Sequence, residues 1–305
     1  MANFAILLPS AEGKAPGGNP LAPDMFDYRT SNTFNYFSEL NPERRAVIKE
    51  LQRVVQESDE AALEKLFGVK SDTLEEAVQV NMEIHGSPLL AAVDRYGPGV
   101  MYEAMEFAEL PTGAQRRLLE NGVIFSGLFG LLRPDDLIPN YRLKMDARLP
   151  EIGKLSKFWR PILSPALNSA LAGKFVWNLL PQAHLDAWED DGSYRAMVQV
   201  KFFDEKDGER KPVTHNVKQL RGALVNFVVR DPAESVDELL EWEAPGGYEL
   251  DEEATTFDEA TKTGTVVMVS SPGWEKRRAE RNAARAEIAR EKAAAKAARE
   301  ADDDE

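Results

Sequence analysis

Residues 122–134 read GVIFSGLFGLLRP and join a strand signal to a tight turn. The first four residues, 122–125, include β-branched and aromatic side chains, and this composition predicts a short buried strand. Gly127 and Gly130 follow, and two glycines three residues apart allow a tight turn and the close approach of another backbone or of a phosphate. Glycines in an apolar loop indicate close packing more often than ligand binding. Alone, the stretch therefore predicts a strand and a turn rather than a site.

Other strand and helix signals surround this stretch. Segments rich in valine, phenylalanine and isoleucine predict strands at 2–8, 175–180, 196–203, 213–216 and 265–269. Asp207-Gly208 lies between two of them and predicts a hairpin turn. Apolar residues at helical spacing predict helices at 41–55, 59–67, 74–82, 88–93, 100–107 and 217–227. The mixture predicts an α/β or α+β fold with a mixed sheet, whose strand order the sequence does not determine.

The composition limits the class of protein. The chain has 305 residues and 43% hydrophobic content, enough for a full core, and no apolar run approaches the roughly 20 residues that span a bilayer. We therefore expect no membrane partner. The lack of cysteine excludes disulfides and cysteine-ligated metals and fits a cytoplasmic protein. A formal net charge of -15 argues against a protein coated with nucleic acid, so any DNA site must be a local basic cleft.

Two parts of the chain differ in composition. Residues 1–273 contain the strand and helix signals and predict a single compact domain. Residues 274–305 are dominated by alanine, arginine, lysine and glutamate and end in four acidic residues. Because this tail has no apolar stripe with which to dock, it favours a solvated charged helix or a frayed extension.

Basic residues gather in two places where they could bind phosphates. Arg133, Arg142 and Lys144 follow the glycine turn, and cations beside exposed amides are typical of a phosphate-binding turn. Lys218 and Arg221 lie three residues apart on one face of the predicted helix 217–227. The second cluster is explained equally well as a pair of surface cations that form ion pairs with nearby carboxylates.

The loop after the first predicted strand is a third candidate. It contains Glu12 and Lys14, and a loop at the end of a sheet strand is a common place for a ligand. It is not a Walker loop, because the GxxxxGK[ST] spacing is absent, and an ordinary solvated loop is the alternative. The segment 94–102 adds another glycine turn with flanking aromatic residues, which could stack on bases but more simply pack.

The sequence lacks the standard catalytic and metal-binding patterns. HExxH, GxSxG and GxGxxG are absent, and the three histidines, His85, His184 and His215, are far apart. We therefore predict no metal and no cofactor. The sequence favours a binding protein over an enzyme, although it does not exclude an enzyme.

Several stretches together resemble the YaaA family of peroxide stress proteins. Residues 126–145 are similar to the family signature SGLYGxLRPxDxIxxYRLxM, and residues 7–14 are similar to its LLPPSEGK start. Further similarities follow in the family's order at 92–102, 158–159, 176–179, 202–208, 218–222 and 247–250. The chain departs from the family pattern at Ser10, Ala11 and Gln219, by one extra residue in the glycine turn of 92–102, and in its tail rich in alanine, arginine and lysine.

The resemblance implies a compact α/β domain that carries a helix-hairpin-helix-like element, and a role in surviving hydrogen peroxide by limiting free iron. Such elements hold phosphates through the amides of a glycine turn, without reading sequence. Gly127 and Gly130 suit that turn, and Lys218 and Arg221 match the family's basic motif KKxRG, which Gln219 makes less basic here.

Two functions from different classes fit these observations. The first is a stress protein that binds double-stranded or structured DNA without sequence specificity and so limits iron-dependent oxidative damage. The alternative is an enzyme or sensor that binds a small anionic or nucleotide-like ligand in the basic cleft. Its anion clamp would consist of Lys14, Arg142, Lys218 and Arg221. Direct iron handling by carboxylates has little support, since no ExxH pair is present.

Overall fold

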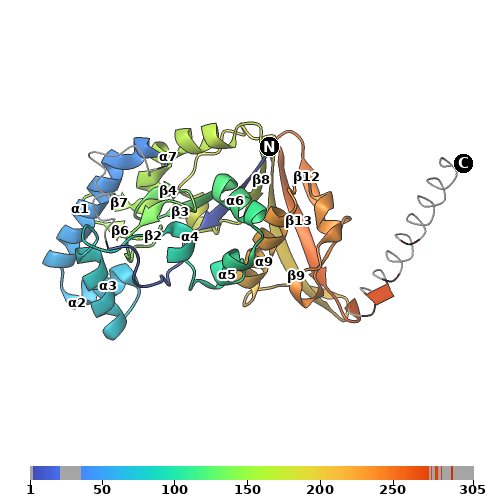
Figure 1. Cartoon of the computed structure of the whole chain (residues 1–305), viewed down its shortest axis with the longest axis horizontal. Coiled ribbons are helices and arrows are strands. Elements are labelled where there is room, and N and C mark those ends of the chain that lie inside the picture. The colour runs from blue at the N-terminus through green and yellow to red at the C-terminus, as the bar shows by residue number, and fades with distance from the viewer. Residues whose placement is uncertain are drawn as a thin grey trace, which may run out of the picture.

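The fold is built on one large, mostly parallel sheet. The computed structural model describes residues 3–20 and 36–274, together with residues 276, 279, 280, 283 and 290 of the tail. Its main strands run in the order β11-β13-β9-β8-β1-β3-β4, with β10 paired to β9 and β12 paired to β13. The strands are β1 Phe4–Pro9, β3 Gly122–Ser126, β4 Gly130–Leu132, β8 Phe175–Asn178, β9 Ala196–Lys206, β10 Glu209–Pro212, β11 Glu249–Leu250, β12 Thr256–Asp258 and β13 Thr263–Ser270. Since β1 and β13 come from opposite ends of the described chain and share this sheet, the molecule is a single compact domain (Figure 1).

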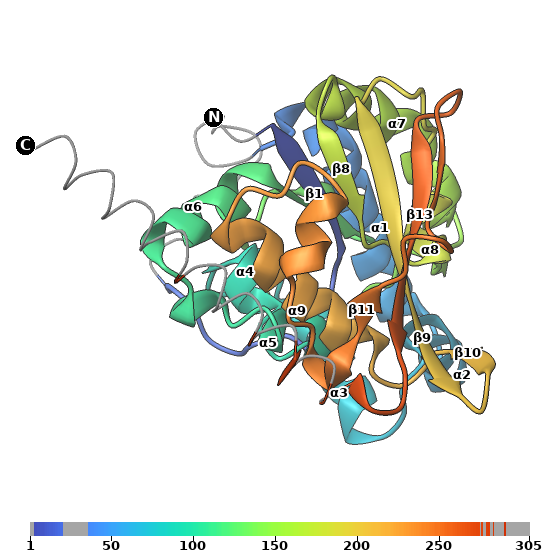
Figure 2. The ribbon, with the colours of Figure 1, turned by 90° about the vertical axis from the view of Figure 1, so that its right-hand side faces the viewer.

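Helices and two small sheets complete the domain. The helices are α1 Asn41–Glu57, α2 Glu60–Phe67, α3 Asp72–Met82, α4 Ala92–Arg95, α5 Val100–Glu103, α6 Thr112–Asn121, α7 Leu155–Leu171, α8 Gln182–Leu185 and α9 Val217–Arg230. Short 3₁₀ turns lie at Ser38–Leu40, Phe107–Glu109, Asp237–Glu241 and Pro245–Gly247. The small sheets pair β2 Leu90–Ala91 with β5 Leu137–Ile138, and β6 Arg148–Leu149 with β7 Gly153–Lys154. Helices α5, α6 and α9 pack together beside the main sheet (Figure 2).

The centre of the sheet is buried because its strands are apolar along their whole length. All residues of β3 and β8 are buried, and so are the first five residues of β1. Continuous burial is typical of parallel strands covered on both faces. The predicted mixed α/β fold is therefore confirmed, with the strands at both ends of the chain and the Asp207-Gly208 hairpin in their expected places.

Three predicted elements differ in the structure. The strand expected at 213–216 is four residues earlier, because Asp207 and Gly208 (φ 54° and 80°) form a two-residue turn that pairs Glu209 directly with Lys206. The helix expected at 88–93 is replaced by β2, and α4 begins only at Ala92. The helix expected at 100–107 ends at Glu103.

Buried arginines anchor the irregular segments. The Arg44 guanidinium donates to the carbonyl oxygens of Phe129 and Leu131, at 2.9 Å and 2.6 Å, and so fixes the β3–β4 hairpin to α1. Arg95 donates in the same way to the carbonyl oxygens of Ala15 and Gly17 in the loop after β1. Within the part of the chain that is described, no helix is long and apolar enough to cross a membrane.

Candidate functional site

The candidate site lies where β1 ends in the middle of the sheet. β1 pairs in parallel with β3 on one side and with β8 on the other, although neither follows it directly in the chain. Such a point, where the strand order reverses, opens a crevice at the carboxyl ends of the strands. The loop that leaves β1 here is 10–14, and it contains Glu12 and Lys14.

Three hydroxyl groups form a chain beneath this loop. The Tyr141 hydroxyl lies 2.6 Å from that of Tyr96 and 2.7 Å from that of Ser126, the last residue of β3. Burial raises the pKa of Tyr141 to about 12, and the pKa of Tyr96 is raised as well. Both phenols therefore stay protonated near neutral pH and can act as hydrogen-bond donors.

The partly buried Lys14 lies over this hydroxyl chain. Its Nζ is 4.2 Å from the centre of the Tyr141 ring and donates to the carbonyl oxygen of Ala11 at 3.1 Å. Burial and the positive charges of Arg142 and Arg95 together lower the pKa of Lys14 to about 7, and the carboxylate of Glu12 opposes this shift. The amine is therefore close to half protonated at neutral pH.

Two more cations reach the same loop from the segment after Tyr141. Glu12 lies 3.6 Å from a guanidinium nitrogen of Arg142 and 3.1 Å from Nζ of Lys144. Asn81 fixes the backbone of Arg142 by hydrogen bonds of 2.9 Å in both directions. Lys14, Arg142 and Lys144 thus form a cation cluster around Glu12. The Glu12 side chain is 58% exposed, so its carboxylate lies on the solvent side of this cluster.

The second basic motif reaches this loop through α5. A Cβ at Gly222 of α9 would lie 2.1 Å from the carbonyl oxygen of Met101, so α9 touches the α5 backbone directly. Just before α5, a Cβ at Gly99 would lie 2.4 Å from that of Ala11. The helix α9 therefore packs on α5, and α5 in turn begins against the loop that contains Lys14.

The two cations of α9 differ in exposure. Lys218 is exposed, whereas Arg221 is partly buried, and burial lowers its pKa. Within the described residues, Nε of Arg221 and Nε of Arg142 are buried without a hydrogen-bond partner. An unpaired buried donor is costly, so both guanidinium groups have hydrogen-bonding capacity that the described part of the chain does not use.

Arg133 does not join these cations. β4 runs antiparallel to β3 with Leu132 opposite Ile124, which returns the chain to the amino end of β3. There Nε of Arg133 donates to the carbonyl oxygen of Leu119 at 3.1 Å, and the guanidinium lies 3.8 Å from the Tyr36 ring centre. The hairpin thus separates Arg133 from Arg142 and Lys144, and Arg133 lies outside the site.

The glycines of the predicted phosphate-binding turn are packing positions. Gly127 and Gly130 are both buried, and a Cβ at Gly127 would lie 2.7 Å from the Lys144 backbone. Gly130 has φ 70°, and a Cβ there would lie 2.9 Å from the Trp159 ring. The turn joins two strands rather than two helices, so a helix-hairpin-helix at this position is a prediction that the structure corrects.

A helix, a glycine turn and a second helix do occur at another place. Helices α4 and α5 flank the segment 96–99, whose Gly99 contacts the loop after β1. The sequence pointed to this segment only through its glycines and aromatic residues. It gave no sign that Tyr96 would pair with Tyr141, because the two residues are 45 positions apart.

Metal binding has no support in the described residues. No group of three or more histidine, aspartate or glutamate side chains lies where it could hold a metal ion in that part of the chain. His184, near the carboxyl end of β8, stands 6.5 Å from Phe125 with its ring edge-on.

His184 predicts an acid sensitivity of the fold. Burial lowers its pKa to about 4, although Asp146 acts in the opposite direction, so the ring is neutral in the folded protein. The pKa of His184 in the folded protein is below the ordinary 6.5, so the unfolded state takes up a proton at a higher pH than the folded state does. The contribution of the neutral ring to the free energy of unfolding is therefore complete above pH 6.5 and is lost as the pH falls toward 4. Between pH 7.5 and pH 5.5 the residue should cost about 1.4 kcal/mol of unfolding free energy. Urea unfolding of His184→Leu should show that much less acid loss than the wild type; an equal loss in both would contradict the assignment.

Comparisons with known proteins agree on one family. The sequence profile of a family described as "Peroxide stress protein YaaA" matches residues 4–254. A UPF0246 protein of Streptomyces coelicolor is 32% identical over 258 residues, which cover 82% of this chain and 92% of the relative. A UPF0246 protein of Rickettsia bellii is 27% identical and covers 72% of this chain and 86% of its own length. An uncharacterized protein of Campylobacter jejuni is 28% identical over 67% of this chain and 78% of its own length.

Proposed function

The chain belongs to the family of the peroxide stress protein YaaA, and from this we propose that it serves the peroxide stress response by binding DNA phosphates at the cation cluster around Lys14. The contacts are to phosphates and not to base edges, so binding is independent of sequence. Covered DNA is less accessible to iron-dependent oxidative damage, which is how binding would protect the cell.

The observation that supports this proposal most is the ion-pair arrangement at Glu12. Arg142 and Lys144 converge on one carboxylate, so the cluster already binds an anionic group of its own chain. Lys218 and Arg221 extend the positive charge along α9, which packs on α5 beside the loop. A duplex presents phosphates at regular intervals, and a row of cations is the complement it requires. The net charge of -15 is compatible, since only a local cleft has to be basic.

Fluorescence anisotropy of a labelled duplex tests the proposal. We expect saturable binding at low salt that is equal for duplexes of different sequence. A mononucleotide should compete only weakly, because it offers one phosphate group where the cleft binds several.

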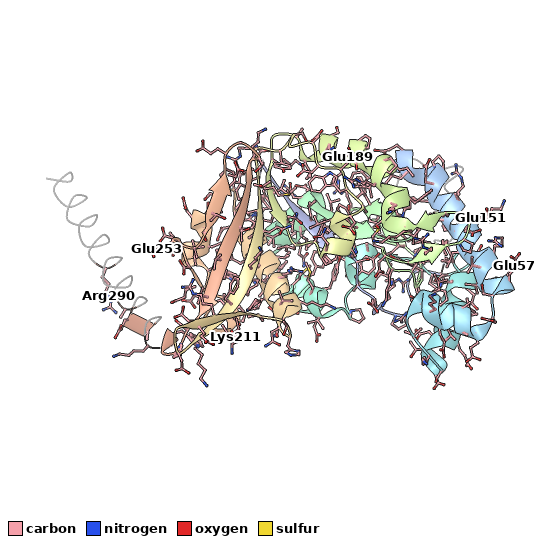
Figure 3. All side chains as sticks on the ribbon, turned by 180° about the vertical axis from the view of Figure 1, so that it is seen from behind. Glu57, Glu151, Glu189, Lys211, Glu253 and Arg290 are labelled. Atoms are coloured by element: carbon pink, nitrogen blue, oxygen red, sulfur yellow. The ribbon has the colours of Figure 1, made fainter. Side chains whose placement is uncertain are left out.

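Removal of the internal carboxylate should strengthen binding. Glu12→Gln deletes the negative charge that occupies Arg142 and Lys144, and each such exposed pair is worth up to about 1 kcal/mol. We expect an affinity for duplex DNA about fivefold higher than that of the wild type, measured by the same anisotropy titration. The matched control is Glu253→Gln, an exposed carboxylate at another part of the surface, which should leave the affinity unchanged (Figure 3). Unchanged or weaker binding in Glu12→Gln would show that DNA does not use these cations.

A second function is favoured by the surroundings of Lys14. A partly buried amine over a chain of protonated hydroxyl groups suits a small, polar, anionic ligand as well as a polymer. A mononucleotide that raises the melting temperature in a saturable way, with no effect of duplex DNA, would favour this ligand-binding function.

A further inference from the structure

Phosphate binding leaves the most unusual group of the site without a role. The cations that a phosphate chain requires are supplied by Arg142, Lys144, Lys218 and Arg221, and arginine and lysine side chains differ in how readily they lose a proton. Lys14 is different, since it is packed against two aromatic rings and beside Arg142. An amine so placed is uncharged for part of the time at neutral pH, and an uncharged amine is a good nucleophile.

We propose that Lys14 is a nucleophile that forms an imine with the aldehyde of a phosphate-bearing deoxyribose, and that in DNA this aldehyde is the open-chain sugar of an abasic site. The proposal rests on the function proposed above, because the phosphates on either side of the aldehyde would be bound by the same cations. It adds a chemical step that phosphate binding alone does not require.

The contacts of Lys14 suit this chemistry. Its Nζ lies 4.2 Å from the ring centre of Tyr141, whose hydroxyl belongs to the chain with Tyr96 and Ser126. These phenols keep their protons, and the two hydrogen bonds within the chain use two of its three hydroxyl protons, so one end of the chain can donate to a carbonyl oxygen. The lowered pKa of Lys14 supplies an uncharged amine at neutral pH without any external base.

The reaction balances without a further reactant. The nitrogen lone pair of Lys14 attacks the aldehyde carbon, the C=O π pair moves to oxygen, and that oxygen takes up a proton to give a carbinolamine. The nitrogen gives up its two protons in the course of the reaction, the carbinolamine hydroxyl takes up a second proton and leaves as water, and the nitrogen lone pair forms the C=N bond. Nothing is oxidised or reduced, and water reverses the step. Arg142 and Lys144 lie beside Glu12, next to this amine, and can bind the phosphates of the same sugar.

Reductive trapping tests the inference on the full chain. The protein is incubated with a duplex that contains one abasic site, or with free 2-deoxyribose 5-phosphate, and sodium cyanoborohydride delivers hydride to any imine carbon. The resulting secondary amine is stable, and peptide mass spectrometry locates it. We expect the adduct on Lys14, with a rate that rises between pH 6 and pH 8 as Lys14 loses its proton. The charged groups that act on Lys14 are Arg142, Glu12 and Arg95.

Two variants give the test its contrast. Lys14→Arg keeps a positive charge but has no nucleophilic amine, and it should lose at least about 20-fold of the adduct. Lys211→Arg removes an exposed lysine of β10, whose side chain is 79% exposed, and should trap as the wild type does (Figure 3). A Lys14 adduct with DNA supports the abasic source, and an adduct with the free sugar phosphate alone assigns the chemistry to a small substrate.

The inference and the DNA-binding function fail separately. Anisotropy with an undamaged duplex is measured on the same preparation. Normal binding with no Lys14 adduct in either arm, or equal trapping in Lys14→Arg, would overturn the imine and leave DNA binding intact. A Lys14 adduct with the free sugar phosphate in a protein that binds no duplex would support the amine chemistry and overturn the DNA function.

Discussion

Reversal of both charges in the α9 motif, with Lys218→Glu and Arg221→Glu, is expected to weaken duplex DNA binding about 50-fold at 0.1 M salt. Each cation that neutralises a phosphate releases a counterion, which contributes a factor of about 8 at that salt concentration, so two contacts give about that loss. The slope of log affinity against log salt should also fall in magnitude by about 2. Fluorescence anisotropy over a salt series measures both quantities.

Two controls separate a loss of phosphate contacts from misfolding and from a general effect of net charge. Arg221 is partly buried, so Lys218→Glu alone, at an exposed position, is measured beside the double variant and should give about an eightfold loss. Arg195→Glu with Lys262→Glu introduces the same charge change at the amino ends of β9 and β13, whereas α9 follows the carboxyl end of β9 in the chain. This control should change the affinity for DNA little. Wild-type affinity in a folded Lys218→Glu, Arg221→Glu protein would remove α9 from the site.

Gly222→Ala is expected to lower the free energy of unfolding by about 3 kcal/mol. The new Cβ would lie 2.1 Å from the carbonyl oxygen of Met101 and 2.8 Å from Cβ of Ala104, so α9 must move away from α5. Overpacking of this kind costs about 1–3 kcal/mol, and the cost is highest where the obstacle is backbone. Chemical denaturation measures the loss.

Gly113→Ala is the matched control for this substitution. Gly113 also lies in a helix, α6, but its nearest neighbour for a new Cβ is the flexible end of Arg117 at 3.6 Å. That variant should be neutral or more stable, because alanine favours helix over glycine by about 1 kcal/mol. Equal stability of Gly222→Ala and the wild type would show that α9 and α5 are not in backbone contact. The pairing of the two basic regions would then lose its structural basis.

Local signals in the sequence were reliable where a segment folds by itself. The apolar run at 4–8 marks a strand that the sheet buries between β3 and β8, and the Asp207-Gly208 turn needs only two adjacent residues, so both have their expected structures. The long helix α7 was missed, since Pro161 and Pro165 lie inside it and proline normally ends a helix. Tertiary packing of Trp159 and Leu163 against the core outweighs that preference.

The site was only partly predictable for a related reason. Glu12, Lys14, Arg142 and Lys144 could each be named from the sequence, but their convergence depends on which strands are neighbours. Arg133 was grouped with Arg142 on sequence distance, and the antiparallel β4 separates them. The pairing of Tyr96 with Tyr141 had no local signal, because it arises from the approach of α4 to the segment after β5.

The central claim is that Arg142, Lys144, Lys218 and Arg221 act together on phosphates. The most direct test is the salt dependence of wild-type binding to an undamaged duplex, measured by fluorescence anisotropy from 20 mM to 300 mM salt. Four phosphate contacts predict a slope of log affinity against log salt of about -4. A slope near zero, or no binding even at 20 mM salt, would contradict a phosphate-binding site formed by these four cations.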